Sequence, residues 1–372
     1  MGDSLEMTLL SKDITFLNDS HRNNIPDKPL EFLKSLKGLT VYDIEGVNTK
    51  KIRIITTLIH GNEPSGLIAC HLWLRSKERP ATNVRIIFCN PEAAKIKPYF
   101  TNRYLSQNDD LNRFFSIASH LSLEDARAQL QSSPVIYRAK QILQLISGKQ
   151  NDPVTHAIGH IEAILDLHNT SGSSPAFAVS VNSDIEHKQL AEFFTNNMIK
   201  TTLPVGAIME QPFKVPIVTI ECGGADQNKS HQVATIGLQN FFDTVSLFKR
   251  KSSKVKVRNK PLRIKLINDA SVGFSNHPLQ TNDVTLRADI ENLNNGETPA
   301  GEFIGWNIDN SDLLFSAIDA DDNDQINHLF EVRGECIYTR VEMQFYMATN
   351  LAEIATKDCL FYITLIEKKK AK

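Results

Sequence analysis

The alternation of apolar runs with amphipathic segments between residues 50 and 250 constrains the fold of this chain more than any other feature. Five runs are apolar almost throughout and predict strands at residues 52–59, 84–88, 163–168, 177–181 and 216–221. Strands of this kind are buried on both faces, as in parallel sheets covered by helices. The segments between them predict helices at about 64–74, 121–147, 187–199 and 230–248. We therefore expect an α/β fold with a mixed, largely parallel sheet flanked by helices.

The regions on either side of this α/β region differ from it in pattern. Residues 1–45 are polar and contain prolines, so we predict an irregular N-terminal extension that packs on an α/β domain of residues 46–250. After the basic stretch at 249–254, short alternating segments are separated by Gly, Asn and Asp, which predicts a smaller β-rich domain at 255–370. At roughly 150 residues per domain, a chain of 372 residues agrees with two domains.

Composition excludes several classes of partner. The net charge of −2 provides no basic field for nucleic acid, and no apolar run approaches the roughly 20 residues that cross a bilayer. The five cysteines are scattered, and the N-terminus lacks a basic segment followed by an apolar run. We therefore expect a cytoplasmic protein without a disulfide framework or a secretory signal, acting on a small molecule. The sequence fixes no oligomeric state, and assembly with copies of itself stays open.

Ionisable residues stand at the ends of three predicted strands. His60 and Glu63 follow the first strand, His168 closes the third, and Glu221 closes the fifth. The carboxyl ends of strands in such sheets open onto the functional crevice. Two His and one Glu are a standard ligand set for catalytic zinc, which keeps one position open for water. Each residue alone is weak evidence, but their occurrence at equivalent strand ends favours one zinc per chain, with Glu221 left over.

Four motifs in this region resemble a known family. They are His60-Gly61-Asn62-Glu63; Arg103-Tyr104 with Asp110-Leu111-Asn112-Arg113-Phe114; Asp166-Leu167-His168-Asn169-Thr170; and Glu221-Cys222-Gly223. In this order they resemble the succinylglutamate desuccinylase/aspartoacylase family, relatives of the zinc carboxypeptidases, over about residues 50–250. The resemblance implies a zinc-carboxypeptidase-like catalytic domain at 46–250, followed by the small β domain that is common in the family.

The resemblance also implies roles for individual residues. It assigns the zinc ligands to His60, Glu63 and His168, the general base to Glu221, oxyanion stabilisation to Arg103, and binding of the substrate carboxylate to Asn112 and Arg113. These residue types suit amide hydrolysis, because a carboxylate near the metal can take a proton from water and return it to the leaving amine. A guanidinium offers a planar fork to a carboxylate. For Asp166, both orientation of the His168 ring and a purely structural role stay open.

The expected activity is zinc-dependent removal of a succinyl- or acetyl-type acyl group from a small N-acyl amino acid. A carboxypeptidase-like peptidase acting on a small peptide is the first alternative, and a non-catalytic binding protein with this fold is the second. Aspartoacylases carry another arginine shortly before the catalytic glutamate, where residues 211–219 of this chain offer only Lys214. A second anchor for substrate carboxylates is therefore not secured by this segment.

Overall fold

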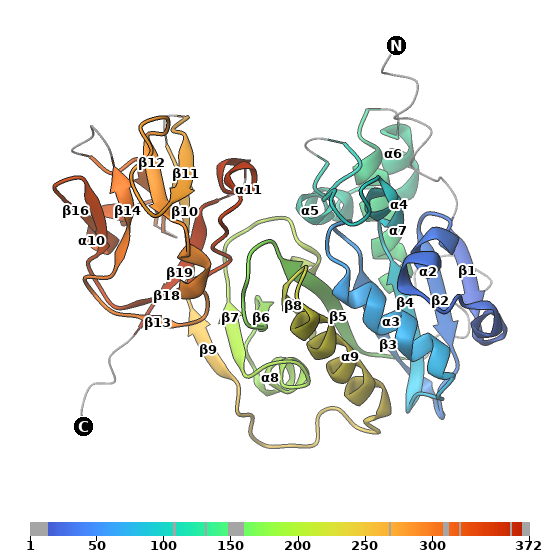
Figure 1. The fold of residues 1–372 in the computed structure, drawn as a ribbon. Coiled ribbons are helices and arrows are strands. Elements are labelled where there is room, and N and C mark those ends of the chain that lie inside the picture. The colour runs from blue at the N-terminus through green and yellow to red at the C-terminus, as the bar shows by residue number, and fades with distance from the viewer. Residues whose placement is uncertain are drawn as a thin grey trace, which may run out of the picture. The chain divides into compact units, whose positions relative to one another are not determined.

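The computed structural model describes residues 14–106, 109–130, 132–147, 160–267, 269–307, 312–319, 321–357 and 359–366. The chain forms two compact units; the first ends before residue 258, and most of the second follows it (Figure 1). The bounds of the first unit are Met1–Asn169, Ala176–Met198 and Pro204–Val257, and those of the second are Thr170–Pro175, Ile199–Leu203 and Arg258–Lys372. Residues 255–257, predicted to belong to the β-rich domain, therefore fall in the first unit.

A nine-stranded sheet organises the first unit, in the order β1-β2-β4-β3-β5-β8-β6-β7-β9. β3 runs parallel to both β4 and β5, whereas β2 is antiparallel to β4 and β6 is antiparallel to β8. The predicted mixed, largely parallel sheet is thereby confirmed. The strands are β1 (Thr15–Asn18), β2 (Thr40–Ile44), β3 (Asn48–Thr57), β4 (Thr82–Phe88), β5 (His160–Thr170), β6 (Phe177–Ser180), β7 (Asn197–Lys200), β8 (Ile217–Gly224) and β9 (Lys256–Asn259).

Helices cover both faces of this sheet, as the apolar strands predict. Neighbouring residues on β3 and β5 enter different cores, so that Ile54 and Ile164 pack in one cluster while Ile55 and Leu165 pack in the other. The cluster with Ile55 contains residues of α2 (Pro29–Ser35), α3 (Ser65–Ser76), α8 (Ile185–Ala191) and α9 (Asn228–Asp243). The cluster with Ile54 contains residues of α5 (Phe115–Ser119), α6 (Leu123–Ala128), α7 (Pro134–Ser147) and η4 (Ile208–Glu210). Shorter helices are η1 (Asp19–Asn24), α4 (Pro91–Lys95) and η2 (Leu111–Arg113).

Three expectations about secondary structure were wrong. In place of the single helix expected at 121–147, the structure has two helices, α6 and α7. The described part of residues 1–45 is not irregular, because β1 and β2 both join the sheet and Pro29 begins α2, where its missing N–H costs no hydrogen bond. The helix expected at 187–199 ends at Ala191. Thr195 Oγ1 accepts the N–H of Asn197 at 3.1 Å, and such a side-chain bond competes with helical hydrogen bonding.

Buried arginines tie strands to the ends of helices. Arg53 on β3 pairs with Glu162 of β5 at 2.8 Å and donates to carbonyl groups at the C-terminal end of α9. Arg85 on β4 binds both carboxylate oxygens of Asp43 on β2 at 2.7 Å and the carbonyl of Leu145 in the last turn of α7. A cation at a helix C-terminus interacts favourably with the helix dipole, so these contacts fix the helices against the sheet.

The second unit is built from two five-stranded sheets, as the predicted β-rich domain requires. Their orders are β13-β18-β19-β10-β15 and β11-β12-β14-β17-β16, and they surround a core of their own. The strands are β10 (Leu262–Leu266), β11 (Val272–Ser275), β12 (Val284–Arg287), β13 (Glu297–Thr298), β14 (Phe303–Asn307), β15 (Phe315–Ser316), β16 (Phe330–Arg333), β17 (Cys336–Thr339), β18 (Met343–Tyr346) and β19 (Phe361–Leu365), with η5 (Ile290–Leu293), α10 (Ile326–Leu329) and α11 (Ala352–Lys357). Across the described residues, helices that combine the length and apolar character needed to span a membrane are absent.

Candidate functional site

A tight turn between β3 and α3 carries the His60–Glu63 motif. Leu58 starts it with a φ of 54°, which turns the chain sharply at the end of the strand. Gly61 then donates its N–H to the carbonyl of Arg103 at 3.0 Å. A Cβ on Gly61 would lie 2.5 Å from the backbone nitrogen of Ala94 and 2.6 Å from the carbonyl oxygen of Asn102. Glycine is therefore required here, because the neighbouring atoms belong to backbone and cannot swing away.

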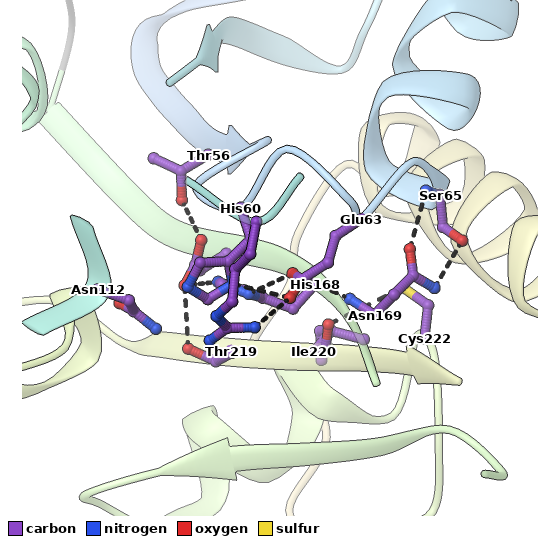
Figure 2. A network of polar contacts seen from close by, with 12 residues as sticks. Thr56, His60, Glu63, Ser65, Asn112, His168, Asn169, Thr219, Ile220 and Cys222 are labelled. Carbon is purple, nitrogen blue, oxygen red and sulfur yellow. Dashed lines mark hydrogen bonds and ion pairs between the residues drawn. The ribbon is translucent and has the colours of Figure 1, made fainter. Parts of the chain in front are cut away.

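Three predicted ligands converge beyond this turn, as Figure 2 shows. His60 Nδ1 lies 2.7 Å from Oε1 of Glu63, and His168 Nδ1 on β5 lies 2.7 Å from Oε2 of the same carboxylate. Each of the three residues offers one atom that could bind a metal, and these three atoms lie within 4.8 Å of one another. All three side chains are buried. The structure thus brings residues 60, 63 and 168 to one point, with an imidazole on either side of a single carboxylate.

Two further carboxylates bind the remaining ring nitrogens. His60 Nε2 lies 2.9 Å from Oδ1 of Asp110, and His168 Nε2 lies 2.8 Å from Oδ2 of Asp166. Asp166 is itself fixed by Thr56, whose hydroxyl donates to Oδ1 at 2.7 Å. Hydrogen bonds of this kind set the tautomer and the orientation of imidazoles that bind metals. Asp166 thus makes the contact with His168 that orientation of the ring requires.

The charges of this group fit a divalent cation. Burial alone would raise the pKa of Glu63 and lower that of His168. Attraction to His60 and His168 instead holds the pKa of Glu63 below its usual range. Attraction to Asp166 and Glu63 holds the pKa of His168 well above its usual range. Each imidazole faces carboxylates on both nitrogens, so both nitrogens can donate only when the ring is a cation. An imidazole whose Nε2 donates to a carboxylate can bind a metal ion through Nδ1, and the His₂Glu donor set suits zinc.

Glu221 is buried on β8 and its carboxyl group is not fully satisfied. Its Oε2 has no hydrogen-bond partner among the described residues. Burial raises the pKa of Glu221 to about 7, with His168 lowering it and Glu63 raising it by smaller amounts. A buried carboxyl group with a free oxygen and a pKa near neutrality can both accept and release a proton. The Glu221 carboxyl group therefore has the properties that proton transfer requires, and it interacts electrostatically with His168 and Glu63.

The predicted arginines meet at Asp110. Arg103 places Nη1 3.2 Å from Oε1 of Glu63 and Nη2 3.3 Å from Oδ2 of Asp110. Arg113 Nη2 lies 4.0 Å from the same Oδ2. The backbone N–H of Asn112 donates to Oδ1 of Asp110 at 3.0 Å, which starts the η2 turn. Both arginine side chains remain partly exposed, at 23% for Arg103 and 30% for Arg113, so a small anion can reach them.

Two residues at the site received no role from the sequence. Asp110 is the first, although it heads the Asp110–Phe114 motif. Asn169 is the second: its N–H donates to Oε2 of Glu63 at 3.2 Å, and its Nδ2 donates to Ser65 Oγ and to the carbonyl of Gly223, both at 2.8 Å. It thereby joins β5 to the start of α3 and to β8 (Figure 2). Their only sequence signal is position, since Asn169 adjoins His168 and Asp110 lies two residues before Asn112.

Comparison with known proteins agrees with the site and the fold. Residues 50–231 match the succinylglutamate desuccinylase/aspartoacylase catalytic domain. The chain is 27% identical over 151 residues to an aspartoacylase from Danio rerio, an alignment that covers 39% of this chain and only 42% of that relative. A succinylglutamate desuccinylase from Chromobacterium violaceum has a TM-score of 0.51 at 15% identity, with 88% of this chain and 87% of that chain covered. For murine aminoacylase 3 the TM-score is 0.52 at 17% identity, with coverages of 85% and 95%.

The fold is thus the zinc-carboxypeptidase-like α/β fold that these solved structures share, as the sequence predicted. Residues 50–231 match the catalytic domain of the succinylglutamate desuccinylase/aspartoacylase family, and the resemblance predicted from the motifs is confirmed.

The close packing at Gly61 leads to a first prediction. The substitution Gly61→Ala should displace the His60–Glu63 turn and weaken zinc binding by at least about tenfold, because loss of ligand orientation typically has effects of this size. Zinc affinity, measured by competition with a chelator, checks this. Gly296→Ala is the control, since its Cβ would meet only the carbonyl oxygen of Leu293 at 3.6 Å. Equal zinc affinities of the two variants would contradict the packing argument.

Proposed function

We propose that this protein is a zinc-dependent amidohydrolase that removes a succinyl- or acetyl-type acyl group from a small N-acyl amino acid. One observation carries the proposal: the buried group of His60, Glu63 and His168, with a carboxylate behind each imidazole, lies beside the incompletely bonded Glu221. The match of residues 50–231 to the succinylglutamate desuccinylase/aspartoacylase catalytic domain supports the same reaction class.

The proposed ligands are His60, Glu63 and His168, with one zinc per chain. When bound, zinc polarises a carbonyl group and lowers the pKa of water to about 7. Glu221 takes a proton from the attacking water as the new C–O bond forms. It returns that proton to the amide nitrogen as the C–N bond breaks, so the products are a carboxylate and an amine. Its raised pKa suits both steps, because neither protonation state is strongly favoured at neutral pH.

Substrate contacts are assigned to the residues around Asp110. Arg103 lies against Glu63, where its guanidinium can stabilise the negative charge that develops on the carbonyl oxygen. Asn112 and Arg113 are assigned to the carboxylate of the amino acid. The segment at 211–219 adds no buried cation, because Gln211 turns inward to the carbonyl of Ala207 and Lys214 is exposed. The proposal therefore names the substrate only as a small N-acyl amino acid.

A cytoplasmic location belongs to the same proposal. Cys70, Cys89, Cys222 and Cys336 are free thiols, which suits a reducing compartment.

A substrate screen tests the reaction class. N-acetyl and N-succinyl amino acids should be hydrolysed, and dipeptides should be poor substrates. Arg113→Lys should raise KM for the N-acyl amino acids about tenfold, because a lysine keeps the charge but loses the two-pronged contact. Steady-state kinetics on the zinc-loaded chain measure both. Hydrolysis of dipeptides alone would favour the peptidase alternative, and no hydrolysis by a chain with stoichiometric zinc would favour the binding protein.

A second kinetic prediction concerns the base. Glu221→Gln should lower kcat by about 10²–10⁴-fold, the usual contribution of general acid–base catalysis, while zinc remains bound. Metal analysis and turnover of the same preparation check this. Cys222→Ala is the control, since the neighbouring buried thiol has no assigned part and this variant should keep its activity. Near-normal turnover of the Glu221 variant would show that another group is the base.

A further inference from the structure

Asp110 and Asp166 both bind a proposed ligand imidazole, but their surroundings differ. Asp166 is completely buried and is held by the hydroxyl groups of Thr56 and Thr219. Asp110 is 15% exposed and faces two arginines. We propose that Asp110 is a positioning residue that aligns His60 for the metal and holds Arg103 beside it, so that one carboxylate links the metal ligands to substrate binding. This inference rests on the metal assignment in the proposed function.

A closed ring of contacts carries the inference. Oδ1 of Asp110 lies 2.9 Å from Nε2 of His60, and Nδ1 of the same ring lies 2.7 Å from Oε1 of Glu63. Oε1 of Glu63 also lies 3.2 Å from Nη1 of Arg103. Nη2 of Arg103 lies 3.3 Å from Oδ2 of Asp110, which closes the ring of contacts. Each of the four residues touches two others. A displacement of Asp110 therefore changes the direction of a ligand ring and the position of the arginine together.

The backbone anchors Asp110 in this ring. Oδ1 also accepts the N–H of Asn112 at 3.0 Å, and this contact caps the 3₁₀ turn of residues 111–113. Gly206 packs against that turn, since a Cβ on it would lie 2.3 Å from the carbonyl oxygen of Arg113. The backbone of its own loop thus holds the Asp110 carboxylate in place, and this carboxylate can in turn orient His60 and Arg103.

The experiment compares three substitutions in the full chain: Asp110→Asn, Asp166→Asn and Asp43→Asn. Asp43 on β2 is the matched control, because it also binds an arginine, Arg85 on β4, and its exposed fraction of 19% is similar to the 15% of Asp110. Zinc affinity is measured by competition with a chelator. The visible spectrum of bound Co²⁺ reports the geometry of the ligands, which a loss of general stability would not change. Neither measurement requires turnover.

Asp110→Asn and Asp166→Asn should each weaken zinc binding about 10–100-fold and alter the Co²⁺ spectrum. Asp43→Asn should leave zinc affinity within about twofold and the spectrum unchanged. Each aspartate substitution is then combined with Arg103→Gln. Effects on zinc affinity should be non-additive for the Asp110 pair, whose side chains touch, and additive for the Asp166 pair. Affinity of the Asp110 variant equal to that of the Asp43 control, or additive effects in the Asp110 pair, would overturn the proposal.

Failures of the two proposals can be told apart. A chain that binds zinc but hydrolyses no N-acyl amino acid would refute the proposed reaction, and zinc affinity would still decide the role of Asp110. A chain that binds neither zinc nor Co²⁺ would refute the metal assignment and this inference with it. If Asp110→Asn does not fold, the Arg103→Gln variant decides. The closed ring of contacts requires that this substitution alter the Co²⁺ spectrum, and an unchanged spectrum would overturn the proposal.

Discussion

The Glu63 carboxylate, shared by two imidazoles from distant parts of the chain, is the interaction on which the site depends. His60 contacts one of its oxygens and His168 the other, with all three groups buried. Buried charge is costly unless it is paired and hydrogen-bonded. Asp110 and Asp166 supply that pairing on the outer side of each ring. The two imidazoles therefore lie between carboxylates, with Glu63 in the middle and Asp110 and Asp166 on the outside. A bound cation would lie between the two imidazoles and Glu63.

The sheet supplies the geometry of this unit. β3 and β5 are parallel neighbours, and Thr57 is paired with Leu167, so the turn after β3 lies beside His168. Because Gly61 has no side chain, the turn packs directly against the backbone of Ala94. Asn169 binds Glu63, the start of α3 and β8 through hydrogen bonds. Ligands held by strands and by a packed turn lose little freedom when a metal binds, and such preorganisation favours affinity.

The strongest sequence signals were those that arise from burial. Apolar runs predicted the central strands and therefore the meeting of residues 60 and 168 at one sheet edge. Short peripheral elements such as β7 lacked such a signal, because a strand of four residues is too short to show a clear periodic pattern. The part played by Asp110 was also unpredictable, since it lies in a loop without periodicity and its partners are up to 50 residues away. Motif order supported the roles of Arg103 and Arg113, but the contacts that hold them appeared only in three dimensions.

X-ray absorption spectroscopy of the zinc-loaded chain shows which atoms bind the metal. It should show nitrogen and oxygen ligands at about 2.0–2.2 Å, two imidazoles in the outer-shell scattering, and no sulfur. His168→Ala should lose one imidazole from this pattern. A sulfur ligand at about 2.3 Å, or an unchanged imidazole count in that variant, would show that zinc binds elsewhere and would contradict the account.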